Sequence, residues 1–586
     1  MAIVHGAEVV AKILKDEGVK YFFAVHGGHS WSLLHAVHKE KIQVIHMRHE
    51  QSCAYAADGW ARTTGQPGVF SGTAGPGMTN SISGIVQAYN ARSPVIALPS
   101  QHPTIEDHKG SLQEAYGAEL CQSVTKMAQR ITDWTTIAYY VQRAFREALA
   151  PPPGPVLVEF PVDILFQRNE ESLQRRLPPQ LTRTEARSLG DPALIEKAVH
   201  MLLEAQRPLI VASDGIFWSG AAKELQELVE LTRIPVYTRR MGLGAVPEEH
   251  PLAVGAAYKK QLAVQCDVVI AIGFRFWWGE GFGQPPSWNP ETKFIQVDAN
   301  PAEIGSHIPV TMGIVGDPKR VLQQMIDCAR EMIKGKRQEL PWLERVRQTR
   351  AAFEQRQREA EQEFHNAKPI HPHRLAKEIV DFLDKDATVI YDSFTGSGYL
   401  TDWFKASFTG QVLDAGPIAG IGHSIGMAIA AQLARPGKQV FVMLGDGGIG
   451  IGGMDIETAL RYRLPIVYLV YNNSSWMGRG PRRLLFRDDM PDWDMLPDIR
   501  YDKMFEAIGC HGEQVENPED IRPALERAFN SGKTAVINTL VDKDVIHPML
   551  QSPLLGQFLM WHPYEEMTDF AKKLAEPVFR MLGLIK

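Results

Sequence analysis

The stretch KQVFVMLGDGG at residues 438–448, read together with LPIVYLVYNN at 464–473, decides the fold. Each begins with a short apolar run of strand length, and each ends in small or polar residues. In a parallel sheet both runs end at the same carboxyl edge, which is where α/β proteins bind ligands. Asp446 and Asn473 are therefore expected to meet at that edge.

A carboxylate beside an amide oxygen is suited to a hard divalent cation. Mg²⁺ prefers such oxygens and usually completes its shell with phosphate oxygens and water. The glycines after Asp446 let backbone N–H groups approach a diphosphate. Gly-Asp-Gly alone is a common turn, but here Asn473 follows Asp446 by 27 positions, after a second buried strand. The combination predicts a site for a metal ion and a diphosphate.

Strand-like runs alternate with helix-like stretches along the whole chain. This pattern predicts an α/β fold with three doubly wound parallel-sheet domains and a C-terminal helical tail. The expected domains and tail are residues 1–165, 190–335, 369–547 and 548–586. Residues 166–190 are charged and contain Pro-Pro, so they are expected to be a linker without a strand. Residues 336–368 predict a solvated connecting helix.

Two distant stretches share one plan. Residues 56–80 and 428–450 both contain an Ala-rich helix ending near Ala-Arg, a turn, a buried strand and a glycine-rich loop. The similarity suggests two related outer domains flanking a third.

Composition excludes several classes of protein. The chain has 586 residues, of which 44% are hydrophobic and 22% charged, and its net charge of −6 favours no polyanionic partner such as nucleic acid. It has neither a signal-like start nor an apolar run long enough for a bilayer, so we expect a cytoplasmic protein without a membrane partner. The five cysteines have no CxxC spacing and are expected to be buried, reduced thiols.

Three further motifs occur elsewhere in the chain, in addition to the two strand ends described above: GPGMTN at 75–80, RHEQSCAYAADGWAR at 48–62 and KFIQVD at 293–298. Together the motifs resemble those of thiamine diphosphate (ThDP) enzymes, over most of the chain. The resemblance implies a pyrimidine-binding domain, a central domain and a diphosphate-binding domain, in that order. It implies ThDP and Mg²⁺ as cofactors, and a homodimer or homotetramer with active sites between subunits.

The resemblance also assigns residues. Glu50 would hydrogen-bond the aminopyrimidine ring and drive the tautomer needed for proton removal, and an apolar pocket would raise the pKa of its carboxyl group. Ile421, in GPIAGIGHSIGMAIAA at 416–431, stands where a bulky side chain bends the cofactor. The implied metal ligands are Asp446, Asn473 and Ser475. The implied cofactor contacts are Gly28, Glu50, Asn80, Gly396, Ser397, Ala419, Ile421, Gly445, Asp446, Gly447, Gly448, Asn473, Ser475, Trp476 and Met477.

Two histidines lie in AVHGGHSWSLL at 24–34. His29 has three interpretations: an acid/base group, a metal ligand or a polar residue at a helix start. The first is favoured because Asp446 and Asn473 already account for the metal, and no cysteine or carboxylate lies at ligand spacing from His26. His26 is interpreted as structural. Gln113, in GSLQEAYG at 110–117, is expected to hold substrate oxygens beside the catalytic residues Glu50 and His29.

The motifs resemble two branches of the family. GGMDIETALRYRLPIVYLVYNN at 452–473 and the central GFRFWWGEGFGQPPSWNPETKFIQVD at 273–298 are similar to 2-hydroxyacyl-CoA lyases and oxalyl-CoA decarboxylases. The stretch at 24–34, with Glu50 and Gln113, resembles benzaldehyde lyase. The first branch implies a carbon–carbon lyase that cleaves a 2-hydroxyacyl-CoA, a small-molecule substrate, to formyl-CoA and an aldehyde or ketone.

Two alternatives stay open. One is a CoA-independent hydroxyketone lyase or carboligase of the benzaldehyde lyase or acetolactate synthase type. The other is a catalytically inactive paralogue, against which the presence of Glu50, Asp446 and Asn473 argues.

Departures from the acyl-CoA branch argue against oxalyl-CoA decarboxylation. Val412 stands where an arginine is expected, Met477 replaces a tyrosine, and the tail from HPMLQSPLL at 547–555 lacks a serine-arginine ending. The tail is interpreted either as a lid or as a packing arm. The resemblance leaves room for ADP or the CoA nucleotide in the central domain. The candidate phosphate contacts there are Lys259, Lys260 and Arg275.

Overall fold

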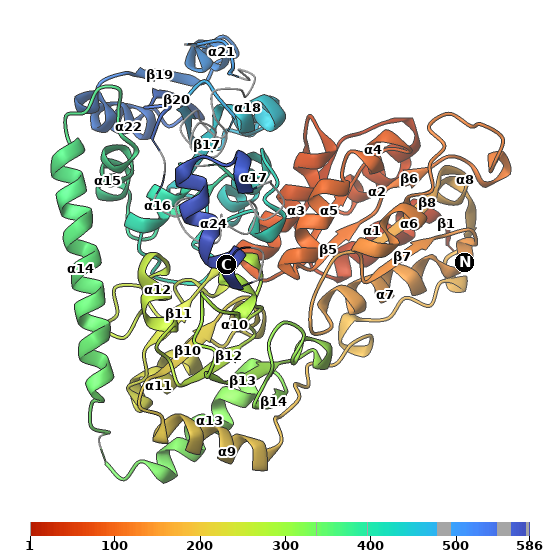
Figure 1. Cartoon of the computed structure of the whole chain (residues 1–586). Coiled ribbons are helices and arrows are strands. Elements are labelled where there is room, and N and C mark those ends of the chain that lie inside the picture. Colours follow the sequence, from red (N-terminus) through yellow and green to blue (C-terminus); the bar gives the residue numbers. More distant parts are fainter. Residues whose placement is uncertain are drawn as a thin grey trace. The chain divides into compact units, whose positions relative to one another are not determined.

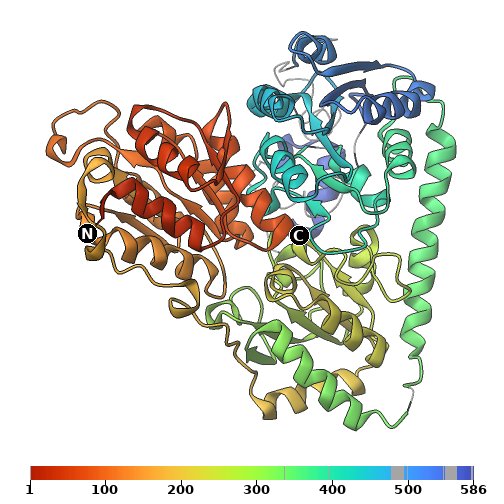
Figure 2. The same cartoon turned by 180° about the vertical axis from the view of Figure 1, so that it is seen from behind.

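The computed structural model describes the backbone of residues 2–335, 337–394, 396–476, 494–497, 499–545, 547, 564–581 and 585. This part of the chain forms three parallel sheets covered by helices, so the predicted α/β class is confirmed (Figure 1, and from behind in Figure 2). The chain divides into two compact units. Unit 1 comprises Met1–Ala186, Leu413–Val440 and Ile451–Ile466, and unit 2 comprises Arg187–Val412, Phe441–Gly450 and Val467–Lys586.

The sheet of unit 1 has the strand order β3-β2-β4-β5-β8-β6, with β7 beside β8. Its strands are β2 (Tyr21–Ala24), β3 (Gln43–His46), β4 (Gly68–Ser71), β5 (Val95–Ala97), β6 (Ser100–Gln101), β7 (Met127–Arg130) and β8 (Val156–Pro161). The apolar runs YFFAV at 21–25, IQVIHM at 42–47, PGVFSG at 67–72, SPVIALP at 93–99 and GPVLVEFP at 154–161 predict five strands, and all five are present. The sequence missed β6 and β7 because one has two residues and the other, MAQR, is half-exposed and polar.

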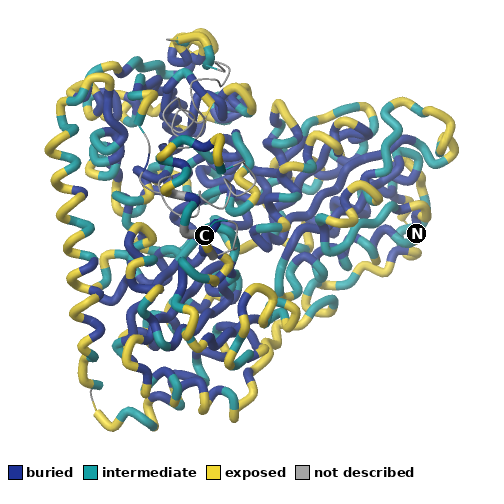
Figure 3. The backbone as a smooth tube through the Cα atoms, viewed as in Figure 1, coloured by how far each residue is buried: buried dark blue, intermediate teal, exposed yellow. Residues whose placement is uncertain are grey.

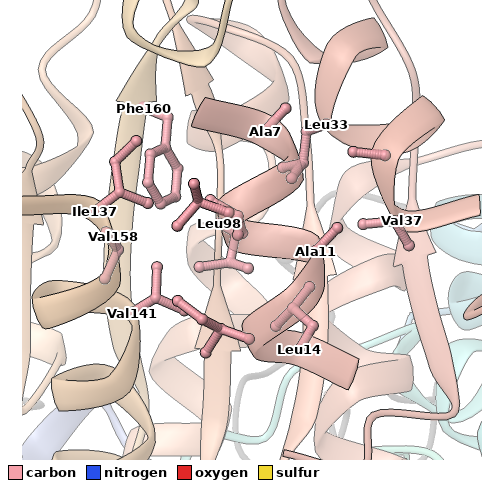
Figure 4. Packing of buried hydrophobic residues seen from close by; sticks show 14 of the residues in the cluster. Ala7, Ala11, Leu14, Leu33, Val37, Leu98, Ile137, Val141, Val158 and Phe160 are labelled. Atoms are coloured by element: carbon pink, nitrogen blue, oxygen red, sulfur yellow. The ribbon is translucent and has the colours of Figure 1, made fainter. Parts of the chain in front are cut away.

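The helices of unit 1 cover its sheet, and α3 and α17 are buried on most sides. They are α1 (Gly6–Asp16), α2 (Trp31–Lys39), α3 (Glu50–Thr64), α4 (Pro76–Thr79), α5 (Ile82–Ala91), α6 (Gly117–Cys121), α7 (Ile137–Leu149), α8 (Val162–Phe166), α17 (His423–Ala434) and α19 (Ile456–Arg461). Ala7, Ala11 and Leu14 recur at helical spacing in α1, and Ala7 and Ala11 lie beside Leu33 and Val37 of α2 in the core (Figure 4).

Glycine contacts set how closely α3 and α17 pack. A Cβ added at Gly59 would lie 2.7 Å from the Cα of Met427, and one at Gly426 would lie 2.5 Å from the carbonyl oxygen of Ser52. Arg62, fully buried in α3, donates hydrogen bonds to the backbone oxygen of Asp414 at 2.5 Å and to its Oδ1 at 2.9 Å. The helix that begins at Glu50 is therefore held rigidly along its length.

Unit 2 carries the other two sheets. The central sheet has the order β11-β10-β12-β13-β14, all parallel, with β10 (Pro208–Ala212), β11 (Val236–Thr238), β12 (Val268–Ile272), β13 (Lys293–Asp298) and β14 (Met312–Val315). The third sheet has the order β16-β15-β17-β18-β20-β19, with β15 (Thr388–Tyr391), β16 (Val412–Leu413), β17 (Val440–Gly445), β18 (Val467–Asn472), β19 (His511–Val515) and β20 (Ala535–Leu540). The sequence missed β14, β16 and β19, which are short or polar. Val412 is buried in β16.

Helices cover both of these sheets. They are α9 (Pro192–Glu204), α10 (Asp214–Ser219), α11 (Ala222–Thr232), α12 (Ala256–Ala263), α13 (Pro318–Met332), α14 (Pro341–Phe364), α15 (Pro372–Phe382), α16 (Ser397–Trp403), α18 (Asp446–Gly452), α21 (Tyr501–Glu506), α22 (Ile521–Asn530) and α24 (Asp569–Met581). The tail is thus helical at α24, while residues 548–563 lie outside the described residues. His371 caps α15 by accepting a hydrogen bond from the N–H of His373, as expected for a helix start.

Of the predictions for the two connecting segments, one is confirmed and one is wrong. The predicted solvated helix is α14, which is exposed along much of its length (Figure 3) and buries Trp342, Leu343 and Val346. The expectation of a strand-free linker at 166–190 is wrong, because β9 (Arg168–Glu170) pairs antiparallel with β1 (Ile3–His5). Val4 is the one apolar side chain that this ribbon buries, and the rest of it is polar or exposed, so no apolar run signals it.

The five cysteines were expected to be buried, and one of them is not. Cys53, Cys121, Cys266 and Cys510 are buried, but Cys328 is partly exposed. Among the described residues, no helix has the length and apolar character needed to cross a bilayer.

Candidate functional site

Three strand ends of the third sheet bring together residues that the sequence predicted. In this sheet β17 and β18 run parallel, with Gly445 opposite Tyr471. Asp446 therefore begins α18 directly beside the segment that starts at Asn472, and the backbone N–H groups of Asn473 and Ser475 lie within hydrogen-bonding range of its carboxylate. The predicted meeting of Asp446 with the Asn-Asn turn is what the strand register produces.

The environment of Asp446 is unusual for a carboxylate. The side chain is only 4% exposed, and burial raises the pKa of its carboxyl group to about 6, although nearby backbone N–H groups oppose the shift. Its Oδ1 accepts a hydrogen bond from the N–H of Gly447 at 2.8 Å. Its Oδ2 is buried without a well-formed hydrogen bond among the described residues. Such an oxygen suits a bound cation.

Glycines at this edge leave no space for side chains. A Cβ at Gly396 would lie 2.3 Å from the ring of Phe394, and one at Gly447 would lie 3.1 Å from the ring of Trp476. Ser397 donates a hydrogen bond from its Oγ to the backbone oxygen of Phe394 at 2.7 Å.

The other implied contacts of this sheet lie at the same three strand ends. Gly445 ends β17, Gly448 is buried in the first turn of α18, and Ser475 donates its N–H to Oδ1 of Asn473 at 3.2 Å. Met477 lies outside the described residues.

A second group of predicted residues lies at the carboxyl edge of the sheet in unit 1. Glu50 follows β3, begins α3 and is 8% exposed. Its Oε2 accepts a hydrogen bond from the side-chain amide of Asn80 at 3.1 Å. The backbone N–H of Arg48 binds Asp455 Oδ1 at 2.8 Å, which fixes the start of the turn that presents Glu50.

His29 and Gln113 lie together at this edge. His29 follows β2 in a single helical turn, is half-buried and hydrogen-bonds the side chain of Gln113. Nδ1 of His29 is buried without a hydrogen-bond partner among the described residues. Burial, and secondly the charge of nearby His102, lower the pKa of His29. The ring is therefore biased towards its neutral form.

Close backbone contacts connect these residues to the loop after β4. A Cβ at Gly75 would lie 2.7 Å from the backbone oxygen of Gln113, and both residues have a positive φ, +61° and +60°. A Cβ at Gly27 would lie 2.4 Å from Oγ1 of Thr73. The segment that contains His29, the segment that contains Gln113 and the loop that leads to Asn80 thus pack on one another.

The remaining predicted residues of unit 1 flank this group. Gly28 is exposed, with no atom within 4 Å of an added Cβ. Ala419 has a left-handed φ of +49°, and a Cβ at the next residue, Gly420, would lie 2.8 Å from Oη of Tyr55 in α3. Ile421 is half-buried just before α17.

His26 contacts two aromatic side chains. Its ring is exposed, accepts a weak hydrogen bond from Nε1 of Trp31 at 3.4 Å, and lies 4.8 Å from the ring of His46. Within the described ranges, no three His, Cys, Asp or Glu side chains form a metal-binding group.

The sequence missed a charged network beside His29. Glu159 is fully buried in β8, where burial raises the pKa of its carboxyl group to about 7, and it accepts a hydrogen bond from the N–H of Ala118 at 3.0 Å. Arg130 donates two hydrogen bonds to Asp107, at 2.6 and 2.8 Å, and Asp107 also binds His102. A glutamate inside the apolar run GPVLVEFP at 154–161 was the signal that could have revealed this network.

The three candidate phosphate contacts of the central domain differ in whether another residue of the domain already binds them. Lys259 is buried and binds Glu280 at 2.5 Å, as does Arg239. Arg275 pairs with Asp214 at 3.1 Å. Lys260 is half-buried, and burial, then the charge of Lys259, lower the pKa of its amine. Lys259 therefore stabilises the interior of the domain, and we do not propose it as a phosphate contact.

The carboxyl edges of two sheets are lined by glycines. One edge carries a buried aspartate, and the other carries a glutamate that is hydrogen-bonded to an asparagine. The carboxyl edge is where α/β proteins bind their ligands. Comparison with protein families identifies the kind. The model for "Thiamine pyrophosphate enzyme, N-terminal TPP binding domain" matches residues 4–120, that for the central domain matches 195–325, and that for the C-terminal TPP binding domain matches 396–539. The chain belongs to the thiamine pyrophosphate enzyme family, which confirms the resemblance seen in the motifs.

Relatives with two different names align over most of the chain. "Acetolactate synthase large subunit IlvG" of Mycobacterium tuberculosis is 33% identical, covering 93% of this chain and 97% of its own. "2-hydroxyacyl-CoA lyase" of Arabidopsis thaliana is 31% identical, covering 92% of this chain and 96% of its own. "2-hydroxyacyl-CoA lyase 1" of Homo sapiens is 28% identical, covering 92% and 95%. These similarities leave the substrate to be argued from the site.

Proposed function

We propose that the chain is a ThDP- and Mg²⁺-dependent carbon–carbon lyase that cleaves a 2-hydroxyacyl-CoA to formyl-CoA and an aldehyde or ketone. The observation that carries the proposal is the state of His29. Its partly buried ring hydrogen-bonds the side chain of Gln113 at the sheet edge that also presents Glu50. A base in that position suits a substrate whose hydroxyl group must lose a proton as the bond breaks.

The residues present fit both cofactors. Asp446 with its unpartnered Oδ2, Asn473 and Ser475 would hold Mg²⁺, and the glycines beside them would admit the diphosphate. Glu50, steadied by Asn80, would bind the aminopyrimidine ring. When bound, ThDP supplies a nucleophilic carbon that adds to the carbonyl carbon of the substrate.

The proton chemistry falls to this chain's own residues. His29 accepts the proton of the substrate hydroxyl while the adjacent carbon–carbon bond breaks. Gln113 orients the ring of His29 by its hydrogen bond. The lowered pKa of His29 keeps the ring neutral, and therefore basic, at neutral pH.

Assembly forms part of the proposal. A homodimer or homotetramer, with Glu50 of one chain facing Asp446 of another, would complete the site. Mixing inactive Glu50→Gln and Asp446→Asn chains tests this arrangement, because a shared site predicts recovery of part of the activity in mixed dimers.

A second candidate is an acetolactate synthase type of activity, which uses no CoA. The 33% identity to relatives of that name favours it, as does the pairing of Lys259 and Arg275 inside the central domain. Release of its hydroxyketone product also requires a hydroxyl group to lose a proton, so His29 does not separate the two candidates, and the incubations below do.

Three incubations of the ThDP- and Mg²⁺-loaded protein separate the candidates. Formyl-CoA with acetone or benzaldehyde should yield a 2-hydroxyacyl-CoA, detected by mass spectrometry. Pyruvate consumed with release of CO₂, without any acyl-CoA product, would establish the alternative instead. Benzoin cleavage without a CoA product would point to a benzaldehyde lyase type of activity. Failure of all three, together with failure to bind ThDP, would indicate an inactive paralogue.

Variants then test the assigned roles. Glu50→Gln should abolish most of the activity. His29→Ala should lower kcat for cleavage about 10²- to 10⁴-fold with a smaller effect on ThDP binding. His26→Ala is the matched control, since this exposed ring lies three residues away and should keep activity near that of the wild type. Equal losses in the two histidine variants would contradict the role of His29.

A further inference from the structure

The amino edge of the sheet in unit 1 carries a surface hollow that the proposed reaction does not use. The hollow has a volume of about 360 Å³, and the polar side chains that line it are Lys15, Lys20, Tyr21, Lys41 and Gln43. β2 and β3 run parallel, and His29 and Glu50 follow the carboxyl ends of these strands. The hollow therefore lies at the opposite end of the strands from the proposed active site.

The strand register brings the three lysines to one place. Tyr21 of β2 is paired with Gln43 of β3, and the N–H of Gln43 donates a hydrogen bond to the backbone oxygen of Lys20 at 3.0 Å. Lys20 directly precedes β2, and Lys41 precedes β3 by two positions. Lys15 lies in the last turn of α1, from which the chain enters β2 through a turn at Gly18, where φ is +77°.

The positive charge of the hollow is not neutralised within the protein. All three lysines are exposed, and among the described residues none of them forms an ion pair. The acids that follow Lys15 already have partners, since Asp16 pairs with Arg176 at 3.1 Å and Glu17 with Arg183 at 2.7 Å. Glu40 precedes Lys41 in the chain but does not line the hollow.

The helix ends at this edge do not need the lysines either. The N–H of Glu17 caps α1 by binding the backbone oxygens of Ile13 and Lys15. The N–H of Glu40 caps α2 in the same way, at the backbone oxygens of Ala36 and His38. Because backbone N–H groups satisfy these carbonyls, the lysine ammonium groups stay available to a ligand.

The chemistry of the lining indicates the class of ligand. A volume of this size suits a small molecule. Lysine ammonium groups act as point charges with several N–H donors each, and they serve phosphate groups well, whereas single carboxylates are better matched by the planar fork of arginine. Tyr21 adds a hydroxyl group on a ring that is held edge-on against Trp60 at 5.1 Å, and Gln43 adds an exposed amide.

We propose that this hollow binds a small ligand that carries several linked phosphate groups, held by Lys15, Lys20 and Lys41. The site is separate from the diphosphate-binding edge of the third sheet. It does not depend on which reaction the protein catalyses.

Calorimetric titration of the full chain with tripolyphosphate tests the proposal. The protein is first saturated with ThDP and Mg²⁺, so that the cofactor site is occupied, and free Mg²⁺ is held constant. We expect binding that weakens as salt concentration rises, because exposed ion pairs are screened. ATP is titrated in a second arm: tighter binding than that of tripolyphosphate identifies a nucleotide as the source of the phosphates, and equal or weaker binding identifies a free phosphate chain.

Two triple variants locate the site. Each exposed ion pair contributes about a threefold factor, so the variant that combines Lys15→Gln, Lys20→Gln and Lys41→Gln should bind tripolyphosphate about thirtyfold more weakly while keeping its affinity for ThDP. The matched control combines Lys223→Gln, Lys293→Gln and Lys385→Gln, which remove the same charge at exposed positions outside the hollow and should leave the affinity unchanged.

Three results would overturn the inference. They are a wild-type protein that does not bind tripolyphosphate, equal losses of affinity in the two triple variants, and citrate binding as tightly as tripolyphosphate. The first two exclude a site in the hollow, and the third excludes its assignment to phosphate groups.

Discussion

The buried carboxylate of Asp446 leads to a quantitative prediction about cofactor binding. A metal ion binds the ionised form, and the pKa of about 6 means that roughly one carboxylate in eleven is ionised at pH 5, compared with nine in ten at pH 7. We therefore expect the affinity for Mg²⁺ in the presence of ThDP to fall about tenfold from pH 7 to pH 5. An exposed aspartate would lose almost nothing over that range.

The ring of Trp476 provides a local optical signal, because it lies against Gly447. Tryptophan fluorescence during Mg²⁺ titration at fixed ThDP should report binding, with equilibrium dialysis as an independent check. The pH dependence of Mg²⁺ binding to free ThDP is measured in the same buffers and subtracted. Asp381→Asn is the matched control, since that aspartate is exposed on α15 and should bind the cofactors as the wild type does.

Asp446→Asn should weaken binding by at least about a hundredfold at pH 7, because a neutral amide replaces the one anionic ligand. What affinity remains should lack the fall between pH 7 and pH 5. Wild-type affinity that is the same at both pH values would refute the assigned burial effect. An Asp446→Asn variant that binds as tightly as the wild type would refute the assigned metal site.

Two further predictions concern the packing of unit 1. Gly75→Ala should push Gln113 away from His29 and lower kcat about a hundredfold. Gly65→Ala is the control, because Gly65 has a similar φ of +73° but no atom within 4 Å of an added Cβ, and it should keep kcat unchanged. Equal kcat values in the two variants would contradict the role of the contact between Gly75 and Gln113. Glu159 has a folded-state pKa raised from 4.5 to about 7, so its contribution to stability is present below pH 4.5 and is lost as pH rises through 7, by about 3 kcal/mol. In urea unfolding, the free energy of unfolding of Glu159→Gln should therefore rise relative to that of the wild type between pH 5.5 and pH 8. A difference between the two free energies that does not change with pH would contradict this.

Local patterns in the sequence predicted the elements whose burial is uniform. The apolar runs that became β8, β12, β17 and β18 are buried at every position, so their composition alone revealed them. Edge strands such as β7 and β19 carry polar residues because one side faces water. Pairing with a neighbour, rather than residue preference, makes them strands.

The residues of the candidate site also fall into those that local sequence predicts and those that depend on the tertiary structure. The places of Asp446 and Asn473 were predictable because they stand directly at the ends of recognisable strands, where position along the chain determines position in space. Glu50 came from the resemblance. The contact of His29 with Gln113 was not predicted, since 84 residues separate them and a glycine with positive φ on another loop sets the approach.

The sequence by itself determined the α/β class, the strand ends that carry Asp446 and Glu50, and the family to which the chain belongs. Only the tertiary structure decided that Lys259 pairs with Glu280 inside the central domain, and that His102 and Arg130 both bind Asp107. The physical reason is that burial and charge pairing depend on residues far apart in the chain. A lysine or a histidine looks the same in sequence whether it faces a ligand, solvent or a buried carboxylate.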